Sequence, residues 1–348
     1  MTNPSETPTN PSDTAATTSG SVMRTVRFES FGGPSVLDVA EIAVPEPQPG
    51  QLTIDVEYAG VNFAEVMFRR GQFPVDLPHC PGLEAVGSVR AVGDGVTGFG
   101  PGDRVAALTL GGGGNAEVVA VGAEHVVRLD GDLAALDGAV AAGALCNVTT
   151  ALGVLTSAGH LARGETVVVL AAAGGVGTAA AQLARSLGAG SVIGVTSSPV
   201  KVEYARGFGY DSVVSYDRIE REVAERTGGA GANLVLDSVG GAFRSSVTGL
   251  LAAFGRHVIF GNAAAEDVTF EGNHPWYTNS SLVGYNLGGV AGRAPQLLRA
   301  HLEQALTEVA KGTVRVDVKV LPLKDVAHAH ELLETRASTG KYVLDVRS

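Results

Sequence analysis

Cysteine is almost absent from this chain of 348 residues, which contains only Cys80 and Cys146. Two cysteines cannot build a disulfide framework, and they are too few for a zinc lobe with four cysteine ligands. Aromatic residues make up 5% and charged residues 18%, whereas hydrophobic residues reach 45%, so the chain can bury a large core. A reducing cytosol is the simplest setting, and we expect a cytoplasmic protein.

Clusters of Lys and Arg are also missing, and the net charge is −11. A basic face for nucleic acid is therefore not expected. We find no stretch that approaches the roughly 20 apolar residues needed to span a membrane. Residues 1–22 are rich in Thr, Ser, Pro and Asn and have no apolar run like that of a secretory signal. We expect them to form a disordered tail, because they cannot bury enough apolar surface to offset the entropy of ordering.

Glycine, by contrast, is abundant at 47 residues, and with proline it separates short β-type runs in the first part of the chain. Short strands at this spacing predict a barrel-like β fold. From about residue 148, apolar strands alternate with helices, which predicts a parallel sheet with helices on both faces. Because β-type runs return at 314–321 and 342–346, we expect the C-terminus to complete the β domain. The expected elements of the middle part include a helix at 149–158, a strand at 166–170 and a helix at 176–187.

A glycine turn follows the apolar strand Thr166–Leu170 and leads into a helix. It reads Ala171-Ala172-Ala173-Gly174-Gly175-Val176-Gly177. The spacing of Gly174 and Gly177 suits close approach of the backbone to a pyrophosphate, and the helix N-terminus offers free N–H groups and a positive dipole end. Ala171 replaces the first glycine of the G-x-G-x-x-G pattern, so the alternative is a tight turn that binds nothing. The strand–turn–helix context favours a dinucleotide site.

The end of the next strand indicates which dinucleotide is bound. NAD sites usually place an acidic residue there, about 20 residues after the turn, to bind the ribose 2′-hydroxyl. Here the sequence is Val195-Thr196-Ser197-Ser198, without an acid, and Lys201 follows. Hydroxyls and a lysine suit a 2′-phosphate, which a carboxylate would repel. We therefore predict NADPH as the cofactor, with Tyr216 covering the adenine or contacting the phosphate; the alternative for Lys201 is a solvated helix lysine.

Taken in order, the motifs resemble the zinc-independent quinone oxidoreductase (zeta-crystallin-like) branch of the medium-chain dehydrogenase/reductase superfamily. The resemblance covers nearly everything after residue 23. The resembling stretches are GVNFAEVMFRRGQF (60–73), PGLEAVGSVRAVGDGVTGFGPGDRV (81–105), AAAGGVGTAAAQLARSLGA (171–189), DSVGG (237–241) and STGKYVLDV (338–346).

The resemblance implies an α/β fold in which a GroES-like β-barrel domain is interrupted by a Rossmann domain, a doubly wound parallel sheet. We assign residues 23–147 and 288–348 to the GroES-like catalytic domain and residues 148–287 to the NADPH-binding domain. The family also implies an active site in the cleft between the domains, a small-molecule substrate, and a homodimer formed by edge pairing of the Rossmann sheets. Residues 271–280, which hold the only tryptophan, are expected to line the pocket or to pack at that interface.

The positions of the zinc ligands in metal-dependent relatives are changed in this chain. Those relatives carry Gly-His-Glu where this chain has Gly82-Leu83-Glu84, and a cysteine within the segment that here reads Gly60-Val61-Asn62-Phe63. Leucine cannot ligate a metal, so we predict no metal site. Cys80 is interpreted as a small buried or loop residue. His328 and His330 are placed on a helix surface rather than on a metal.

The catalytic candidates carried over from the family are Asn62, Glu65 and Thr150. Asn62 is predicted to orient the substrate or to be a structural amide; Glu65 stands where relatives mostly have Asp; Thr150 is predicted near the nicotinamide or in a packing role. The tyrosine that some relatives have at Met67 is absent, and Asn115 replaces an aromatic residue. Lys341 matches a lysine of the family cleft but fits the surface equally. The predicted cofactor-binding residues are Ala173, Gly174, Gly175, Val176, Gly177, Ser197, Ser198, Lys201, Tyr216, Ser238, Val239, Phe260, Gly261 and Lys341.

These observations predict an NADPH-dependent, zinc-independent oxidoreductase that delivers hydride to a quinone or an α,β-unsaturated carbonyl compound. Without a metal to polarise a simple alcohol or ketone, a conjugated acceptor is the better fit. Two alternatives remain open at this stage. One is an enoyl-thioester reductase, and the other is a non-redox natural-product enzyme or binding protein on the same fold.

Overall fold

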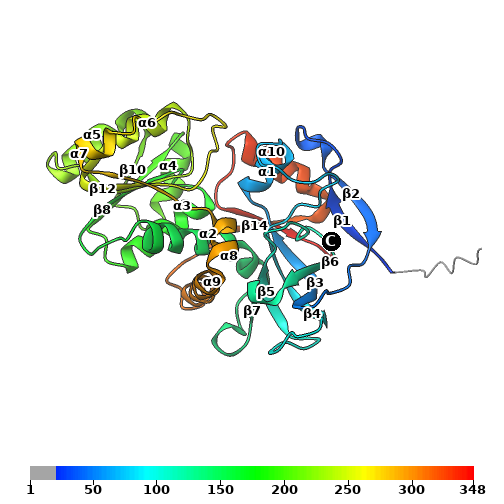
Figure 1. The fold of residues 1–348 in the computed structure, drawn as a ribbon. Coiled ribbons are helices and arrows are strands. Elements are labelled where there is room, and N and C mark those ends of the chain that lie inside the picture. The colour runs from blue at the N-terminus through cyan, green and yellow to red at the C-terminus, as the bar shows by residue number, and fades with distance from the viewer. Residues whose placement is uncertain (1–20) are drawn as a thin grey trace, which may run out of the picture.

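A computed structural model describes residues 21–348 and contains two large β-sheets, one in each of two lobes (Figure 1). Residues 1–20 of the expected tail lie outside the described residues. Strand β1 begins at Val22. The first large sheet is mainly antiparallel and has seven strands. They are β14 (Val318–Pro322), β15 (Lys341–Asp345), β3 (Gln51–Gly60), β4 (Glu84–Val92), β5 (Arg104–Leu108) and β7 (Val126–Arg128) in spatial order, with β6 (Val118–Gly122) paired to β3.

The C-terminal strands complete this antiparallel sheet. Strand β15 pairs antiparallel with β3, with Val343 opposite Gly60, and β14 pairs parallel with β15. In Figure 1 the blue N-terminal and red C-terminal segments accordingly share one lobe. The expectation that the chain returns to finish the β domain is confirmed. A small additional sheet consists of β1 (Val22–Arg27) and β2 (Asp38–Ala43).

The second large sheet is parallel throughout and has six strands. In spatial order they are β10 (Ser212–Ser215), β9 (Ser191–Thr196), β8 (Thr166–Leu170), β11 (Ala232–Asp237), β12 (Leu251–Ile259) and β13 (Ser281–Gly284). The first strand of this unit, β8, lies beside the fourth, β11, so the chain order reverses between them. Ligands of doubly wound sheets bind beyond the carboxyl ends of the strands at such a reversal. The predicted fold class is therefore confirmed, and it places the expected dinucleotide site at the ends of β8 and β11.

Ten α-helices of the described residues cover the two sheets. They are α1 (Phe63–Arg69), α2 (Gly138–Gly153), α3 (Gly175–Ser186), α4 (Pro199–Arg206), α5 (Ile219–Thr227), α6 (Ala242–Thr248), α7 (His274–Thr278), α8 (Leu287–Arg293), α9 (Pro295–Ala310) and α10 (Val326–Glu334). Short 3₁₀ turns precede several of them, and a π turn at Val154–Ala158 extends α2.

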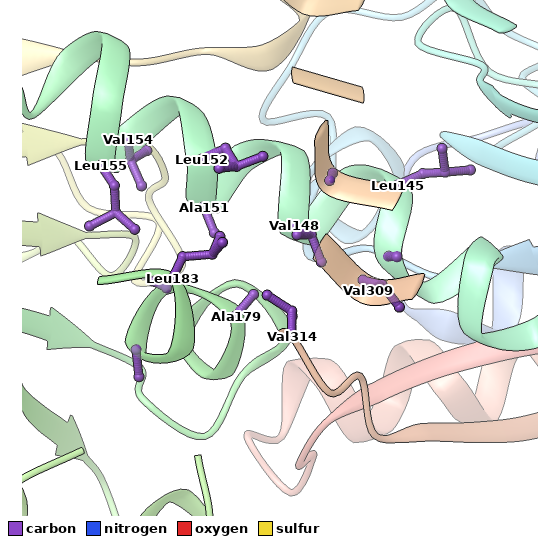
Figure 2. Close-up of a cluster of buried hydrophobic side chains, with 14 of the residues drawn as sticks. Leu145, Val148, Ala151, Leu152, Val154, Leu155, Ala179, Leu183, Val309 and Val314 are labelled. Carbon is purple, nitrogen blue, oxygen red and sulfur yellow. The ribbon is translucent and has the colours of Figure 1, made fainter. Parts of the chain in front are cut away.

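Helix α2 joins the two lobes. It contacts strands of the antiparallel sheet as well as helices α3 and α9, and Figure 2 shows apolar side chains of α2, such as Val148 and Leu152, in this junction. The helix begins at Gly138, eleven residues before the start predicted at 149, because the side chain of Asp137 caps it by accepting a hydrogen bond from Val140 N. The domain boundary predicted between residues 147 and 148 thus falls inside α2.

The apolar length of α2 corrects one expectation. The helical stretch Gly138–Ala158 has 21 residues and contains an 18-residue window with a mean hydropathy of 1.6, so it is long and apolar enough to cross a membrane by length and composition alone. The expectation that no such stretch exists was wrong because much of its apolar character comes from alanine, which is small, and because polar residues interrupt the run. In this structure 89% of its most apolar window is buried inside the protein, which is what a core helix requires.

Candidate functional site

A tight turn joins β8 to α3 at the carboxyl end of the parallel sheet. Gly174 is the N-cap of α3, and Ala171 has a left-handed φ of 52°, a conformation that glycine adopts most easily. The chain therefore keeps the shape of a glycine turn although Ala171 replaces the first glycine. A Cβ on Gly177 would lie 2.6 Å from the carbonyl oxygen of Ala171, so glycine is required where the helix packs on the strand.

The outer side of this turn fits a pyrophosphate. A Cβ on Gly174 would meet only the Ala171 carbonyl oxygen, at 3.2 Å, within 4 Å of it. The first N–H groups of a helix have no partner within the helix, and here they belong to Gly175, Val176 and Gly177. Together with the positive end of the helix dipole, they can hold an anionic group. The turn thus meets the requirement that was predicted from its glycine spacing.

Two residues that the sequence did not single out support the turn. Tyr210 donates a hydrogen bond from its hydroxyl to the carbonyl oxygen of Gly177, at 2.7 Å. The amide of Asn147, on α2, lies so close to Gly175 that a Cβ there would be 2.0 Å from its Nδ2. Neither residue stands in a recognisable motif, and both reach the turn from distant segments.

The residues predicted for the 2′-phosphate gather beyond the end of β9. Ser197 and Ser198 follow this strand directly, and Lys201 lies in the first half of α4. Burial and the positive charge of Arg336 lower the pKa of Lys201. Arg336 also acts on Tyr216, whose pKa is raised by burial. Arg336 is therefore a second cation at this place, and no local motif in the sequence marks it.

The residues predicted for the nicotinamide side lie in two adjacent loops, which follow β11 and β12. Ser238 and Val239 follow β11, and Phe260 and Gly261 follow β12. The loops are tied together: Ala263 N donates to the Ser238 carbonyl oxygen at 3.1 Å. A Cβ on Gly261 would be 2.8 Å from that same oxygen, so the close approach depends on glycine. Both loops emerge on the β11 side of the point where the strand order reverses.

The catalytic candidates Asn62 and Glu65 belong to a buried polar cluster. Asn62 caps α1, and its backbone N–H donates to Glu65 Oε1 at 2.8 Å in a capping box. The Asn62 side chain accepts from Lys341 Nζ at 2.6 Å and donates to Glu84 Oε1 at 2.8 Å. Lys341 Nζ also lies 2.5 Å from Glu84 Oε1, and both side chains are almost completely buried. The sequence placed Lys341 at the cofactor or on the surface, and the structure puts it in this cluster.

Glu65 is fully buried, and both of its carboxylate oxygens accept hydrogen bonds. Its Oε2 accepts a hydrogen bond from Asn115 Nδ2 at 2.8 Å, so Asn115 is a structural partner rather than a pocket wall alone. Burial raises the pKa of Glu65 to about 7, more than the hydrogen bond from Asn62 and the charge of Lys341 lower it. The carboxyl group therefore titrates near neutral pH.

Helix α2 brings Thr150 next to the polar cluster. Cys146, one turn before Thr150, donates its backbone N–H to Glu84 Oε2 at 2.6 Å. Burial and the charge of Glu84 raise the pKa of the Cys146 thiol to about 12, so it stays protonated. Lys341 links the same cluster to the dinucleotide turn, because the preceding Gly340 donates its N–H to Ala173 O at 3.1 Å. The three catalytic candidates and the turn thus meet around α2.

One predicted placement is wrong. His330 is not on a helix surface but fully buried, where Arg69 Nε lies 3.4 Å from its Nδ1. Burial and the Arg69 charge lower the pKa of His330 to about 3, so the imidazole is neutral. The sequence could not show this because the buried Arg69 comes from α1. His328 is exposed, as predicted.

Metal ligands do not gather in the part of the chain that the structure describes. Among residues 21–348 there is no group of three or more His, Cys, Asp and Glu side chains that could hold a metal ion. Cys80 is a half-buried free cysteine in an irregular segment. Glu84, which follows the position of the missing histidine, is engaged by Lys341 and Asn62.

A GroES-like sheet joined to a dinucleotide-binding parallel sheet defines a class of two-domain proteins, and comparisons with known proteins give the same class. Residues 48–150 match the alcohol dehydrogenase GroES-like domain, and residues 175–304 match the family described as zinc-binding dehydrogenase. A quinone oxidoreductase of Pseudomonas aeruginosa is 32% identical over 330 residues, which cover 92% of this chain and 98% of that protein.

Solved structures agree with this relationship over the same range. The quinone oxidoreductase of Pseudomonas syringae pv. tomato DC3000 has a TM-score of 0.87 and 31% identity, covering 93% of this chain and 100% of that one. The Escherichia coli quinone oxidoreductase, solved in complex with NADPH, also has a TM-score of 0.87, with 29% identity and the same coverage. The chain belongs to the zinc-independent quinone oxidoreductase branch of the medium-chain dehydrogenase/reductase superfamily.

Proposed function

We propose that this protein is an NADPH-dependent oxidoreductase that reduces quinones or α,β-unsaturated carbonyl compounds without zinc. The observation that carries the proposal is the dinucleotide turn together with the end of β9, where Ser197, Ser198 and Lys201 stand in place of the acid of NAD-specific proteins and Arg336 adds a neighbouring positive charge. Membership of the quinone oxidoreductase branch and the NADPH complex of the Escherichia coli relative support it. We place the enzyme in the cytoplasm.

The turn and its neighbours fit the cofactor. Backbone N–H groups of residues 175–177 would hold the pyrophosphate, and Ser197, Ser198, Lys201 and Tyr216 would hold the phosphorylated ribose and the adenine. The loops at Ser238-Val239 and Phe260-Gly261 would frame the nicotinamide ribose. When bound, NADPH supplies the hydride, and the protein supplies binding, orientation and electrostatics.

The buried polar cluster would organise the reacting end of the site. The Asn62 amide oxygen already accepts a hydrogen bond from Lys341, and its amide nitrogen already donates one to Glu84. We therefore assign Asn62 a positioning role. An ammonium group has three donors, and Lys341 uses two of them on these partners. Its third N–H and the hydroxyl of Thr150 are the donors that we assign to the acceptor oxygen or to the carboxamide of the nicotinamide. Such donors stabilise the negative charge that reduction places on a conjugated carbonyl oxygen.

The residues at the positions of the zinc ligands do not suit zinc. Leu83 offers no ligand atom, and Glu84 is neutralised by an ammonium group 2.5 Å away rather than facing a free site. A lysine next to a would-be ligand also repels a divalent cation. Hydrogen-bond donors are therefore the polarising groups of this site.

The function is tested by following the absorbance of reduced nicotinamide with NADPH or NADH and a panel of acceptors. The panel contains a 1,4-quinone, a 2-alkenal, a cyclic enone, an enoyl-CoA and a simple ketone. We expect consumption of NADPH with the quinone or the enone and little with the ketone. Turnover of the enoyl-CoA alone would favour a thioester reductase, and tight NADPH binding without any turnover would favour a non-redox protein. Absence of NADPH binding would contradict the proposal.

Lys201 is predicted to set the preference for NADPH. We expect Lys201→Met to raise the KM for NADPH about tenfold, the value of one charged hydrogen bond, and to leave the KM for NADH unchanged. The matched control is Lys311→Met, since the Lys311 side chain is largely exposed after α9. Equal changes for the two cofactors, or none for either, would show that Lys201 does not contact the 2′-phosphate.

We also propose that the protein is a homodimer joined along β13. This strand is the outer strand of the six-stranded sheet, and within the described residues only its β12 side is paired. Large aromatic side chains are exposed near it. Trp276, with 73% of its surface exposed, stacks on Tyr277, with 68% exposed. The segment that carries them is tied to the end of the sheet, because Phe254 N donates a hydrogen bond to Asn279 O. A second copy would cover them, because exposed edges and aromatic patches favour association. Light scattering should give twice the chain mass, and Trp276→Lys should lower it.

A further inference from the structure

A buried arginine lies behind the two loops that the proposed function assigns to the nicotinamide side. Arg244, on α6, has only 6% of its surface exposed. Burial of a guanidinium group is strongly unfavourable unless partners compensate for the lost water. Arg244 has two such partners, one at the end of β11 and one in the loop after β12. Arg244 therefore connects the two segments that frame the nicotinamide side.

The first partner is Asp237, the last residue of β11. Its Oδ2 accepts from Arg244 Nε at 2.7 Å, and its Oδ1 accepts from the backbone N–H groups of Val239 and Gly240 at 2.8 and 2.9 Å. Burial alone would raise the pKa of Asp237, but hydrogen bonds from His257, Arg244 and Gly240 outweigh it and lower the pKa to about 2. Asp237 is therefore an anion that holds the loop at 238–240 directly.

The second partner is the loop after β12. Arg244 Nη2 donates to the carbonyl oxygen of Gly261. Its other neighbour in this region is Gly240, where a Cβ would lie 3.1 Å from Arg244 Nη2 and 2.2 Å from Asn262 Oδ1. Gly240, Asn262 and Arg244 are therefore packed closely against one another. One guanidinium group spans from the anion at the end of β11 to the backbone at the end of β12.

His257 holds the other side of Asp237. Its Nε2 is 3.2 Å from Asp237 Oδ2, and its Nδ1 is 3.2 Å from Thr248 Oγ1 on α6. Both Asp237 and His257 are fully buried. The anion is thus fixed on strand β12 as well as on α6, so that Arg244 acts from a rigid base.

We propose that Arg244 is a positioning residue for the nicotinamide half of NADPH. It sets the spacing between the loops at 238–240 and 260–262, and it touches neither cofactor nor substrate itself. The inference rests on the proposed NADPH site. The adenosine half of that site, at β9 and α4, lies on the other side of the strand-order reversal, and the hydrogen bonds of Arg244 run instead to Asp237 and Gly261. Helix α6 does reach Tyr216 on the adenosine side, but through the ring of Phe243. Loss of Arg244 should therefore act on one half of the cofactor only.

The test compares NADPH with 2′,5′-ADP, which has the phosphorylated adenosine but no nicotinamide. Arg244→Lys retains a positive charge beside Asp237 but cannot span both loops, because an ammonium group lacks the fork of a guanidinium. We expect calorimetry to show an about tenfold weaker binding of NADPH, with 2′,5′-ADP changed less than about twofold, and we expect kcat to fall as well. Arg244→Met should show the same pattern more strongly if it folds.

The matched control is Arg256→Lys. Arg256 also bridges two segments of the same domain, through Glu165 at 2.7 Å and Gly159 O at 2.8 Å, but it reaches residues that precede β8. It should leave both ligands unchanged. Equal weakening of NADPH and 2′,5′-ADP by Arg244→Lys, or no change in either, would overturn the inference. A wild-type protein that binds neither ligand would instead overturn the proposed cofactor.

Discussion

Replacement of Lys341 by methionine is expected to lower the free energy of unfolding by about 3–5 kcal/mol, since it leaves a buried carboxylate without its cation. The Lys341 ammonium lies 2.5 Å from Glu84 Oε1, with 4% and 0% of the two side chains exposed. Asn62 and the backbone N–H of Cys146 would still donate to Glu84, but neither carries a charge. Urea unfolding at pH 7 measures the loss directly.

A second substitution separates loss of the charge pair from loss of packing. In the double variant Lys341→Met/Glu84→Gln no charge is left unpaired, and we expect it to recover at least half of the lost stability. Lys319→Met is the matched control, because Lys319 is exposed on the neighbouring strand β14; it should change stability by less than about 0.5 kcal/mol. A single variant as stable as the wild type would show that Glu84 is not an anion in the folded protein.

The same substitution is informative about activity. Lys341 donates a hydrogen bond to the Asn62 side chain, and it is one of the two donors that we assign to the reacting end of the site. In the stability-restored double variant we expect kcat for the quinone to fall about a hundredfold, because an electrostatic donor is lost, while NADPH still binds. A double variant with wild-type kcat would limit Lys341 to a structural role.

The dinucleotide turn could be predicted from the sequence because its strand, its glycines and its helix are contiguous in the chain. Strand β8 ends at Leu170 and α3 begins at Gly175, within one residue of the predicted bounds. Glycine at 177 is required by the close packing of helix on strand, and glycine at 174 leaves the outer side of the turn open; their spacing in the sequence indicated both. The alternation of strands and helices predicted a parallel sheet, and the family resemblance implied the doubly wound order whose reversal places a site there.

The polar cluster could not be assembled in this way, because its members are far apart in the chain. Lys341 bonds to Asn62 across 279 positions, and Arg69 bonds to Glu334 across 265. A single lysine in a strand has the same sequence signature whether it faces solvent or a buried carboxylate. For the same reason the burial of His330 by Arg69, and the approach of Arg336 to Lys201, were beyond local reasoning.

Helix α1 was overlooked although the sequence contains a signal for it. Asn62 and Glu65 have the spacing of a capping box, Asn-x-x-Glu, and the structure shows both of its hydrogen bonds. The helix has only seven residues, so its hydrophobic periodicity is too short to recognise. The capping pair would have predicted the contact between two catalytic candidates that had been selected for other reasons.

Glu65 is expected to make the stability of the protein depend on pH in the opposite direction to an ordinary paired carboxylate. Its pKa rises from 4.5 to about 7 on folding, so the folded state holds the proton more tightly than the unfolded state. The stabilising contribution is complete below pH 4.5 and disappears as the pH rises through 7. Over that range it amounts to about 3 kcal/mol, because each pKa unit is worth about 1.4 kcal/mol.

Glu65→Gln removes this titration and keeps an acceptor for the N–H of Asn62. The difference in unfolding free energy between variant and wild type should therefore shift toward the variant by about 2.5 kcal/mol between pH 5 and pH 8, measured by urea unfolding at several pH values. Taking the difference cancels the titration of all groups unaffected by the substitution. Lys341 and Glu84, the charged neighbours of Glu65, are the groups whose coupling could alter the midpoint. Parallel curves for variant and wild type would mean that Glu65 is ionised throughout, and a midpoint near 7 would identify it as the group that titrates beside Asn62.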